Sequence, residues 1–141
     1  MSVRIKRVYE HPVPADGARV LVDRLWPRGL GKKDAALACW LRDLAPSNEL
    51  RKWFHAHPAL WTQFRSRYMK ELEAPEASAQ LDQLYELAEA NRTVTLVYAS
   101  RNEERNNAAV LRDLLNGVRK PPSSSGPPKA AAMPKRARAR K

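Results

Sequence analysis

The sequence predicts a small three-layer α/β domain, with a short, mainly parallel sheet flanked by helices, followed by a disordered basic tail. Apolar, β-branched patterns at residues 19–25 and 93–99 predict two strands, and several helical patterns separate them. This order is typical of parallel sheets with helical connections. The charge is also uneven: residues 1–116 hold 18 bases and 15 acids, whereas the remainder holds eight bases and no acid. We therefore place the domain at residues 1–117 and the tail at residues 118–141.

The totals limit the class of protein. A chain of 141 residues is long enough for one domain with its own core. Its only cysteine, Cys39, excludes an internal disulfide and fits a reducing compartment, where we expect it to be a small core residue. No stretch approaches the roughly 20 apolar residues that span a bilayer, and the N-terminus lacks a signal-like apolar segment. We expect a cytoplasmic protein with no membrane association.

The first third of the chain predicts two strands joined by a loop. Residues 3–9 begin with alternating apolar and basic side chains, which indicates a strand with one wet face. Residues 11–17 contain two prolines and a glycine and predict a loop. Val20, Leu21 and Val22 are consecutive apolar residues, so the strand at 19–25 is expected to be covered on both faces.

Helix signals follow. Asp34 suits the N-cap of a short helix extending to residue 41, and Ser47 suits the N-cap of the next. Pro58 suits the first turn of another helix, and Pro75 ends that helix before a third at about 76–90. After the strand at 93–99, residues 100–103 have capping-box spacing, and residues 106–115 predict the last helix. Asn116 and Gly117 are expected to end it.

Charged and polar residues follow both apolar strands. If these strands are parallel neighbours, the loops at 23–29 and 98–107 meet in one crevice, where such sheets usually bind ligands. Two arginines beside a helix N-terminus favour a phosphate or a carboxylate. We therefore predict a small anionic ligand and seven candidate ligand-binding residues: Asp23, Arg24, Trp26, Arg28, Tyr98, Ser100 and Asn106.

The same residues also fit a structural role. Asp23 could pair with Arg24, Arg28 or a helix terminus, and Trp26 could cover the edge of the sheet. Asp23 as a general base needs a raised pKa, which nearby arginines oppose, so an electrostatic or orienting role is easier to support. No catalytic residue is assigned, and enzymatic activity stays open.

Cofactor motifs are missing from the sequence. It contains no P-loop, no G-x-G-x-x-G pattern and no serine nucleophile elbow. Its histidines and cysteine do not have the spacing of metal ligands. We predict no cofactor and no metal, and the pattern specifies no oligomeric state.

The basic tail suggests a second function. A flexible cationic segment binds the phosphates of DNA or RNA without reading sequence. An incidental, solubilising tail is the other interpretation, and no helix-turn-helix is evident. The candidate nucleic-acid-binding residues are Lys129, Lys135, Arg136, Arg138, Arg140 and Lys141.

Four motifs together carry a resemblance: V-L-V-D-R-L-W-P-R-G at 20–29, W-L-R-D-L-A-P-S-N-E-L-R-K-W-F at 40–54, F-R-S-R-Y-M-K-E-L at 64–72 and V-T-L-V-Y-A-S-R at 94–101. Over about residues 3–115 the chain resembles family 488 of the domains of unknown function, in its YeaO-like branch. The resemblance implies a compact bacterial α/β domain with no established reaction or ligand. It also implies that the D-R-L-W-P-R-G motif and Asn106 face the expected pocket.

One departure from the wider family matters. The resemblance implies that other branches carry a cysteine just after the last strand and a Cys-His-Arg set at the start of the next helix. Here those places read Tyr98-Ala-Ser and Asn106-Asn-Ala. Thiol or imidazole chemistry therefore does not carry over to this chain, and the basic tail lies outside the family pattern.

Overall fold

The computed structural model describes residues 2–117, 135–136 and 138–139. Four strands form one parallel sheet in the order β1-β4-β2-β3. β4 is paired with β1 and β2 on its two sides, as the prediction of parallel central strands requires. The α/β class is confirmed. The sheet strands are β1 (Ser2–Arg7), β2 (Ala18–Leu21), β3 (Cys39–Trp40) and β4 (Thr93–Tyr98), and the short β5 (Lys135–Arg136) and β6 (Arg138–Ala139) pair with each other.

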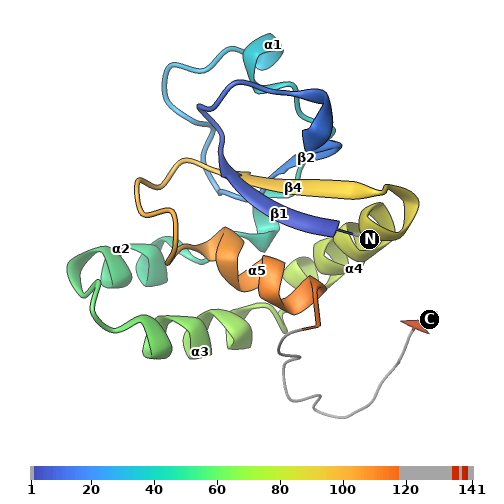
Figure 1. The fold of residues 1–141 in the computed structure, drawn as a ribbon. Coiled ribbons are helices and arrows are strands. Elements are labelled where there is room, and N and C mark those ends of the chain that lie inside the picture. The colour runs from blue at the N-terminus through green and yellow to red at the C-terminus, as the bar shows by residue number, and fades with distance from the viewer. Residues whose placement is uncertain (1, 118–134, 137, 140–141) are drawn as a thin grey trace.

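The helices are divided unequally between the two faces of the sheet. Four longer helices gather on one side, as Figure 1 shows below the strands. The other face is covered by α1, by a 3₁₀ turn, η1, and by the loop at residues 22–31. The helices are α1 (Lys32–Ala35), α2 (Asn48–Ala56), α3 (Trp61–Glu71), α4 (Pro75–Ala90) and α5 (Asn107–Leu115), with 3₁₀ turns η1 (Pro14–Asp16) and η2 (Arg42–Leu44).

The consecutive apolar residues of the second strand pattern are covered on both faces, as predicted. Val20 and Val22 belong to the large core under the helices, whereas Leu21 belongs to a smaller cluster on the other face. All three are fully buried. β2 itself ends at Leu21, but the N–H of Val22 still donates to the carbonyl of Val97 at 3.2 Å.

The helix predicted from Asp34 to residue 41 is wrong beyond its first turn. α1 ends at Ala35, Gly31 rather than Asp34 is its N-cap, and Ala36 has a φ of 49°. Cys39 then begins β3, which pairs with β2. A short apolar segment that can extend a buried sheet gains more from cross-strand pairing than from its weak helix propensity.

The second correction concerns Pro58. α3 begins at Trp61, and Pro58 lies in the turn before it. The N–H of Leu60 donates to the carbonyl of His57 at 3.0 Å, which places the proline at the second position of a four-residue turn. Proline's fixed φ suits that position as well as it suits the first turn of a helix. Ser47 is confirmed as an N-cap, because its Oγ accepts the N–H of Leu50 at 3.1 Å.

The domain's last described helix ends at Leu115, and Gly117 has a φ of 75°, a conformation that glycine adopts without strain. Most of the predicted disordered tail lies outside the described residues, including Lys129, Arg140 and Lys141. No helix in the described part of the chain combines the length and the apolar character needed to cross a membrane.

Candidate functional site

The ends of β2 and β4 lie side by side and are joined by one carboxylate. Asp23 follows β2, and its Oδ2 accepts the N–H of Ala99, which follows β4, at 2.8 Å. Its Oδ1 accepts the side-chain amide of Asn107, the first residue of α5, at 3.2 Å. The same amide also donates to the carbonyl of Val22 at 2.8 Å. The two loops predicted to form the site are therefore tied together through Asp23.

The environment of Asp23 raises the pKa of its carboxyl group. Burial is the main cause, because it disfavours the charged form. The N–H of Ala99, the amide of Asn107 and the charge of Arg51 act in the opposite direction but do not cancel it. Nearby arginines were expected to oppose a raised pKa, and Arg51 does so, but desolvation outweighs its effect.

The two arginines of the first loop differ in their surroundings. The guanidinium of Arg24 donates to the carbonyls of Ala45 at 3.1 Å and Pro46 at 3.4 Å, so it points toward the segment before α2. Arg28 is exposed, and its carbonyl accepts the hydroxyl of Tyr9 at 2.9 Å. This contact holds the 26–29 turn against the end of β1.

Trp26 packs on the face of the sheet away from the four longer helices. Its indole N–H donates to the carbonyl of Leu30 at 2.7 Å, and its ring meets Trp40 edge-on with 5.5 Å between centroids. Trp40 in turn donates to the carbonyl of Asp23 at 2.6 Å. The two indoles therefore hold both ends of the loop that follows β2, at Asp23 and at Leu30.

The second loop contributes three of the candidate residues, in three different settings. Tyr98 is 1% exposed, and burial is the main cause of its raised pKa. Ser100 is exposed, and its Oγ accepts the N–H of Asn102 at 3.2 Å. Asn106 is buried and caps α5, with its Oδ1 accepting the N–H of Ala109 at 2.9 Å. The capping box expected at residues 100–103 is therefore wrong.

Sequence reasoning missed two residues that hold the strand ends. Asn107 carries no local signal that separates it from Asn106, yet it is the one that reaches Asp23. Arg7 donates from its guanidinium to the carbonyls of Ala99 and Ser100, each at 3.0 Å. These bonds attach the segment after β4 to the end of β1.

Sequence reasoning also missed a buried ion cluster, which lies on the face of the sheet away from the four longer helices. Asp16 accepts hydrogen bonds from Arg19 at 2.8 Å and from Lys6 at 3.1 Å, and its carbonyl accepts the hydroxyl of Thr95 at 2.7 Å. Burial by itself raises the pKa of Asp16, but the bonds from Val13, Lys6 and Arg19 and the charge of Lys6 outweigh it, so the pKa is lowered. The cluster fixes η1 over the middle of the sheet.

Neither the cysteine nor the described acids and histidines suggest redox or metal chemistry. Cys39 is half-buried on the edge strand, and burial raises the pKa of its thiol, which disfavours the reactive thiolate. Within the described residues, no three side chains of His, Cys, Asp or Glu gather as metal ligands do.

The comparisons with known proteins identify a family. A family model described as "Inactive DUF488-N3 subclade" matches residues 2–129. The chain is 48% identical to the uncharacterized protein Rv3073c of Mycobacterium tuberculosis over 115 residues, which are 82% of this chain and 94% of that protein. It is 41% identical to the uncharacterized protein YeaO of Escherichia coli over 118 residues, which are 84% of this chain and 100% of YeaO. No solved structure matches. The chain therefore belongs to the DUF488-N3 family, in the subclade described as inactive.

Proposed function

We propose that this protein is a cytoplasmic domain that binds a small anionic ligand at the carboxyl ends of β2 and β4. The observation that carries this proposal is the bridge from Asp23 to Ala99 and Asn107, which joins the start of the 23–29 loop to the start of α5. Arg28 lies exposed in that loop, and residues 100–105, which precede α5, are also exposed. Guanidinium groups beside a helix start favour phosphate and carboxylate groups.

Binding without turnover fits the bonding of Asp23. Each of its oxygens accepts a hydrogen bond from the protein itself, so the carboxylate already serves to orient the two loops. Asn106 likewise uses its amide in capping α5. The description of the matching subclade as inactive supports a binding role over a catalytic one.

A thermal-shift screen of phosphorylated and carboxylated metabolites tests the proposal. A ligand present at about 100 times its Kd stabilises a protein by about 2.7 kcal/mol, which raises the Tm by several degrees. We expect at least one compound to do this for the wild type and to lose most of its effect on Arg28→Ala. Arg92→Ala is the matched control, because Arg92 is an exposed arginine at the opposite end of β4.

Two results contradict the proposal. One is a screen in which no compound stabilises the wild type more than Arg28→Ala. The other is an equal loss of stabilisation in Arg28→Ala and Arg92→Ala, which indicates that only the net charge of the protein matters.

A second candidate function follows from the charge of the tail. Residues from 117 onward hold eight bases and no acid, whereas the preceding residues are nearly balanced. We propose as an alternative that the six candidate cations of the tail bind DNA or RNA phosphates without sequence preference. β5 and β6 contain three of them, Lys135, Arg136 and Arg138.

Deletion of residues 118–141 tests this alternative in a gel-retardation assay. If all six cations contact phosphates of duplex DNA, the logarithm of the affinity falls with the logarithm of salt with a slope of about −5. The truncated protein is expected to bind weakly and with a shallower slope. Equal retardation by both proteins would show that the tail is not responsible.

A further inference from the structure

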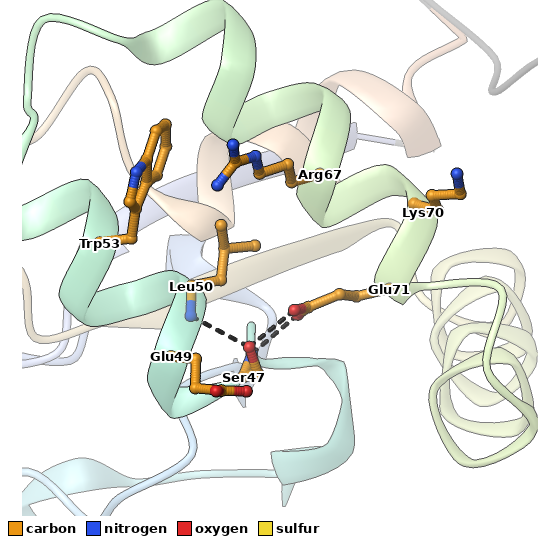
Figure 2. Close-up of a pocket in the computed structure, with 7 residues that line it drawn as sticks. All are labelled: Ser47, Glu49, Leu50, Trp53, Arg67, Lys70 and Glu71. Carbon is orange, nitrogen blue, oxygen red and sulfur yellow. Dashed lines mark hydrogen bonds between the residues drawn. The ribbon is translucent and has the colours of Figure 1, made fainter.

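α2 presents two different sides to the rest of the protein. One side faces a hollow of about 620 Å³ against α3, and Figure 2 shows Glu49, Leu50 and Trp53 of α2 lining it. Arg51 does not line this hollow. The helical repeat of about 3.6 residues per turn puts Arg51 on the side of α2 away from these three residues.

The start of α2 is attached to the strand-end site by Arg24. The guanidinium of Arg24 donates to the carbonyls of Ala45 at 3.1 Å and Pro46 at 3.4 Å, and these two residues immediately precede the N-cap of α2. The N–H of Arg51 donates to the carbonyl of that N-cap, Ser47, at 2.9 Å. Arg51 therefore lies about one helical turn from the residues that Arg24 holds beside the strand ends.

The charge of Arg51 acts on the carboxylate of Asp23. Burial is the main cause of the raised pKa of Asp23, and the charge of Arg51 opposes that rise, so the two side chains lie near each other. They form no ion pair within 4.0 Å, and the oxygens of Asp23 accept the N–H of Ala99 and the amide of Asn107 instead. Asp23 therefore attracts Arg51 toward the strand ends without occupying its N–H donors.

The donors of Arg51 are available to a ligand. Arg51 is exposed, and among the described residues it takes part in no ion pair. Arg24 differs, because its guanidinium is bonded to two carbonyls. The charges of the exposed loop at residues 100–105 balance, with two arginines and two glutamates. Arg24 and Arg51 together therefore outweigh the single charge of Asp23 and leave this end of the sheet cationic.

We propose that Arg51 contacts the anionic group of the ligand at the strand-end site, from the side of α2. This inference rests on the proposed function. The planar fork of a guanidinium fits two oxygens of a carboxylate or a phosphate, so Arg51 would bind either group through two parallel hydrogen bonds. Arg24 is a positioning residue in this arrangement, because it keeps the start of α2 against the loop that follows β2. A purely structural role for Arg51 would affect Asp23 and the stability of the protein but not the binding of an anion.

The test is a titration of the full chain with inorganic phosphate at constant ionic strength, followed by ¹⁵N–¹H NMR. We expect saturable shifts of the backbone amide signals of Ala99 and Asn107, the two residues bonded to Asp23. Arg51→Ala is expected to weaken phosphate binding about tenfold, and Arg51→Lys, which keeps the charge without the planar fork, by less. Carboxyl ¹³C NMR is expected to show a higher pKa for Asp23 in Arg51→Ala than in the wild type, because an attractive charge is removed.

Lys52→Ala is the matched control. Lys52 is the next residue of α2, is exposed and carries the same charge, but it projects about 100° farther round the helix. Its loss is expected to weaken phosphate binding less than about twofold.

Three results overturn this inference: no saturable shift with phosphate at these amides, equal weakening by Arg51→Ala and Lys52→Ala, or the same pKa of Asp23 in Arg51→Ala and the wild type. The proposed function is judged separately, by the metabolite screen. A ligand whose stabilising effect is lost in Arg28→Ala but kept in Arg51→Ala would leave the proposed function standing and refute the role of Arg51 alone.

Discussion

Replacing Asp16 with asparagine is expected to destabilise the protein by about 3 kcal/mol or more, because it removes one charge from a buried ion cluster. The side chains of Asp16 and Arg19 are only 5% and 3% exposed. Arg19 bonds Oδ2 of Asp16 at 2.8 Å, and Lys6 reaches both of its oxygens at 3.1 Å. Denaturant unfolding of both proteins at pH 7 measures the difference in free energy of unfolding.

The cost is large because Arg19 has few other acceptors. Its Nε donates to the carbonyl of Ala35 at 2.8 Å. Among the described residues its buried Nη2 has no hydrogen-bond partner. The amide oxygen of Asp16→Asn can still accept a hydrogen bond from Arg19, but the buried guanidinium loses its counter-charge, and uncompensated burial of a charge is among the most destabilising changes known.

Asp113→Asn is the matched control. Asp113 also pairs with an arginine, Arg112, at 3.2 Å, but the two side chains are 30% and 35% exposed. Solvent screening makes such a pair worth less than about 1 kcal/mol. If Asp16→Asn and Asp113→Asn destabilise the protein equally, the buried cluster does not contribute to stability as described.

The same cluster sets the response to acid. The pKa of Asp16 is lowered in the folded protein, so the unfolded chain takes up a proton first as the pH falls. The contribution of Asp16 is therefore complete above its ordinary pKa of 3.8 and is lost as the pH falls below that value. Asp16→Asn lacks this loss, so the stabilities of the two proteins are expected to converge in that acidic range.

The sheet could be predicted from the sequence because its central strands carry strong local signals. The apolar run at Val20–Val22 and the pattern of β4 predicted two buried parallel neighbours, and the adjacency of their ends followed. β3 has only two residues, and its pairing with β2 depends on a contact that no local pattern encodes. The prediction of a helix from Asp34 to residue 41 was wrong for this reason.

The polar side chains were harder to place than the apolar ones. Alternation in β1 correctly predicted that Lys6 lies on the face away from Val3. That face is covered there by η1, and Lys6 is paired with Asp16 of this turn. A pattern of polar residues does not distinguish a solvated face from one closed by ion pairs. Asn106 and Asn107 show the same limit, since identical neighbours cap α5 and bridge to Asp23 respectively.

Replacing Asp23 with alanine is expected to destabilise the protein by about 2 kcal/mol and to remove the stabilisation by anionic ligands. The substitution leaves the N–H of Ala99 and the amide of Asn107 without their acceptor, and each such loss in a partly buried setting costs about 1–3 kcal/mol. Water is expected to recover part of this cost. The start of the 23–29 loop then loses its bond to Ala99, so the position of Arg28 depends on the contact between its carbonyl and Tyr9 at the other end of the loop.

Asp23→Asn separates the hydrogen bonds from the charge. Its amide oxygen can still accept the N–H of Ala99, so we expect a change within about 1 kcal/mol at pH 7. The raised pKa of Asp23 means that the folded wild type keeps a proton which the unfolded chain has already lost. Wild-type stability relative to Asp23→Asn is therefore expected to rise as the pH falls toward 3.8 and to decline as it rises through the folded pKa.

Comparing the two variants shows how Asp23 acts. The stability that is lost in acid through protonation of Asp16 is common to the wild type and both variants, so it cancels in the differences between them. If Asp23→Ala loses ligand stabilisation while Asp23→Asn keeps it, the carboxylate acts through its hydrogen bonds as a tie between the loops. If both variants lose it equally, the hydrogen bonds alone are not sufficient, and the negative charge of Asp23 is also needed to hold the cations around it. A difference between the wild type and Asp23→Asn that does not vary with pH would contradict the burial of an ionised carboxylate at the strand ends.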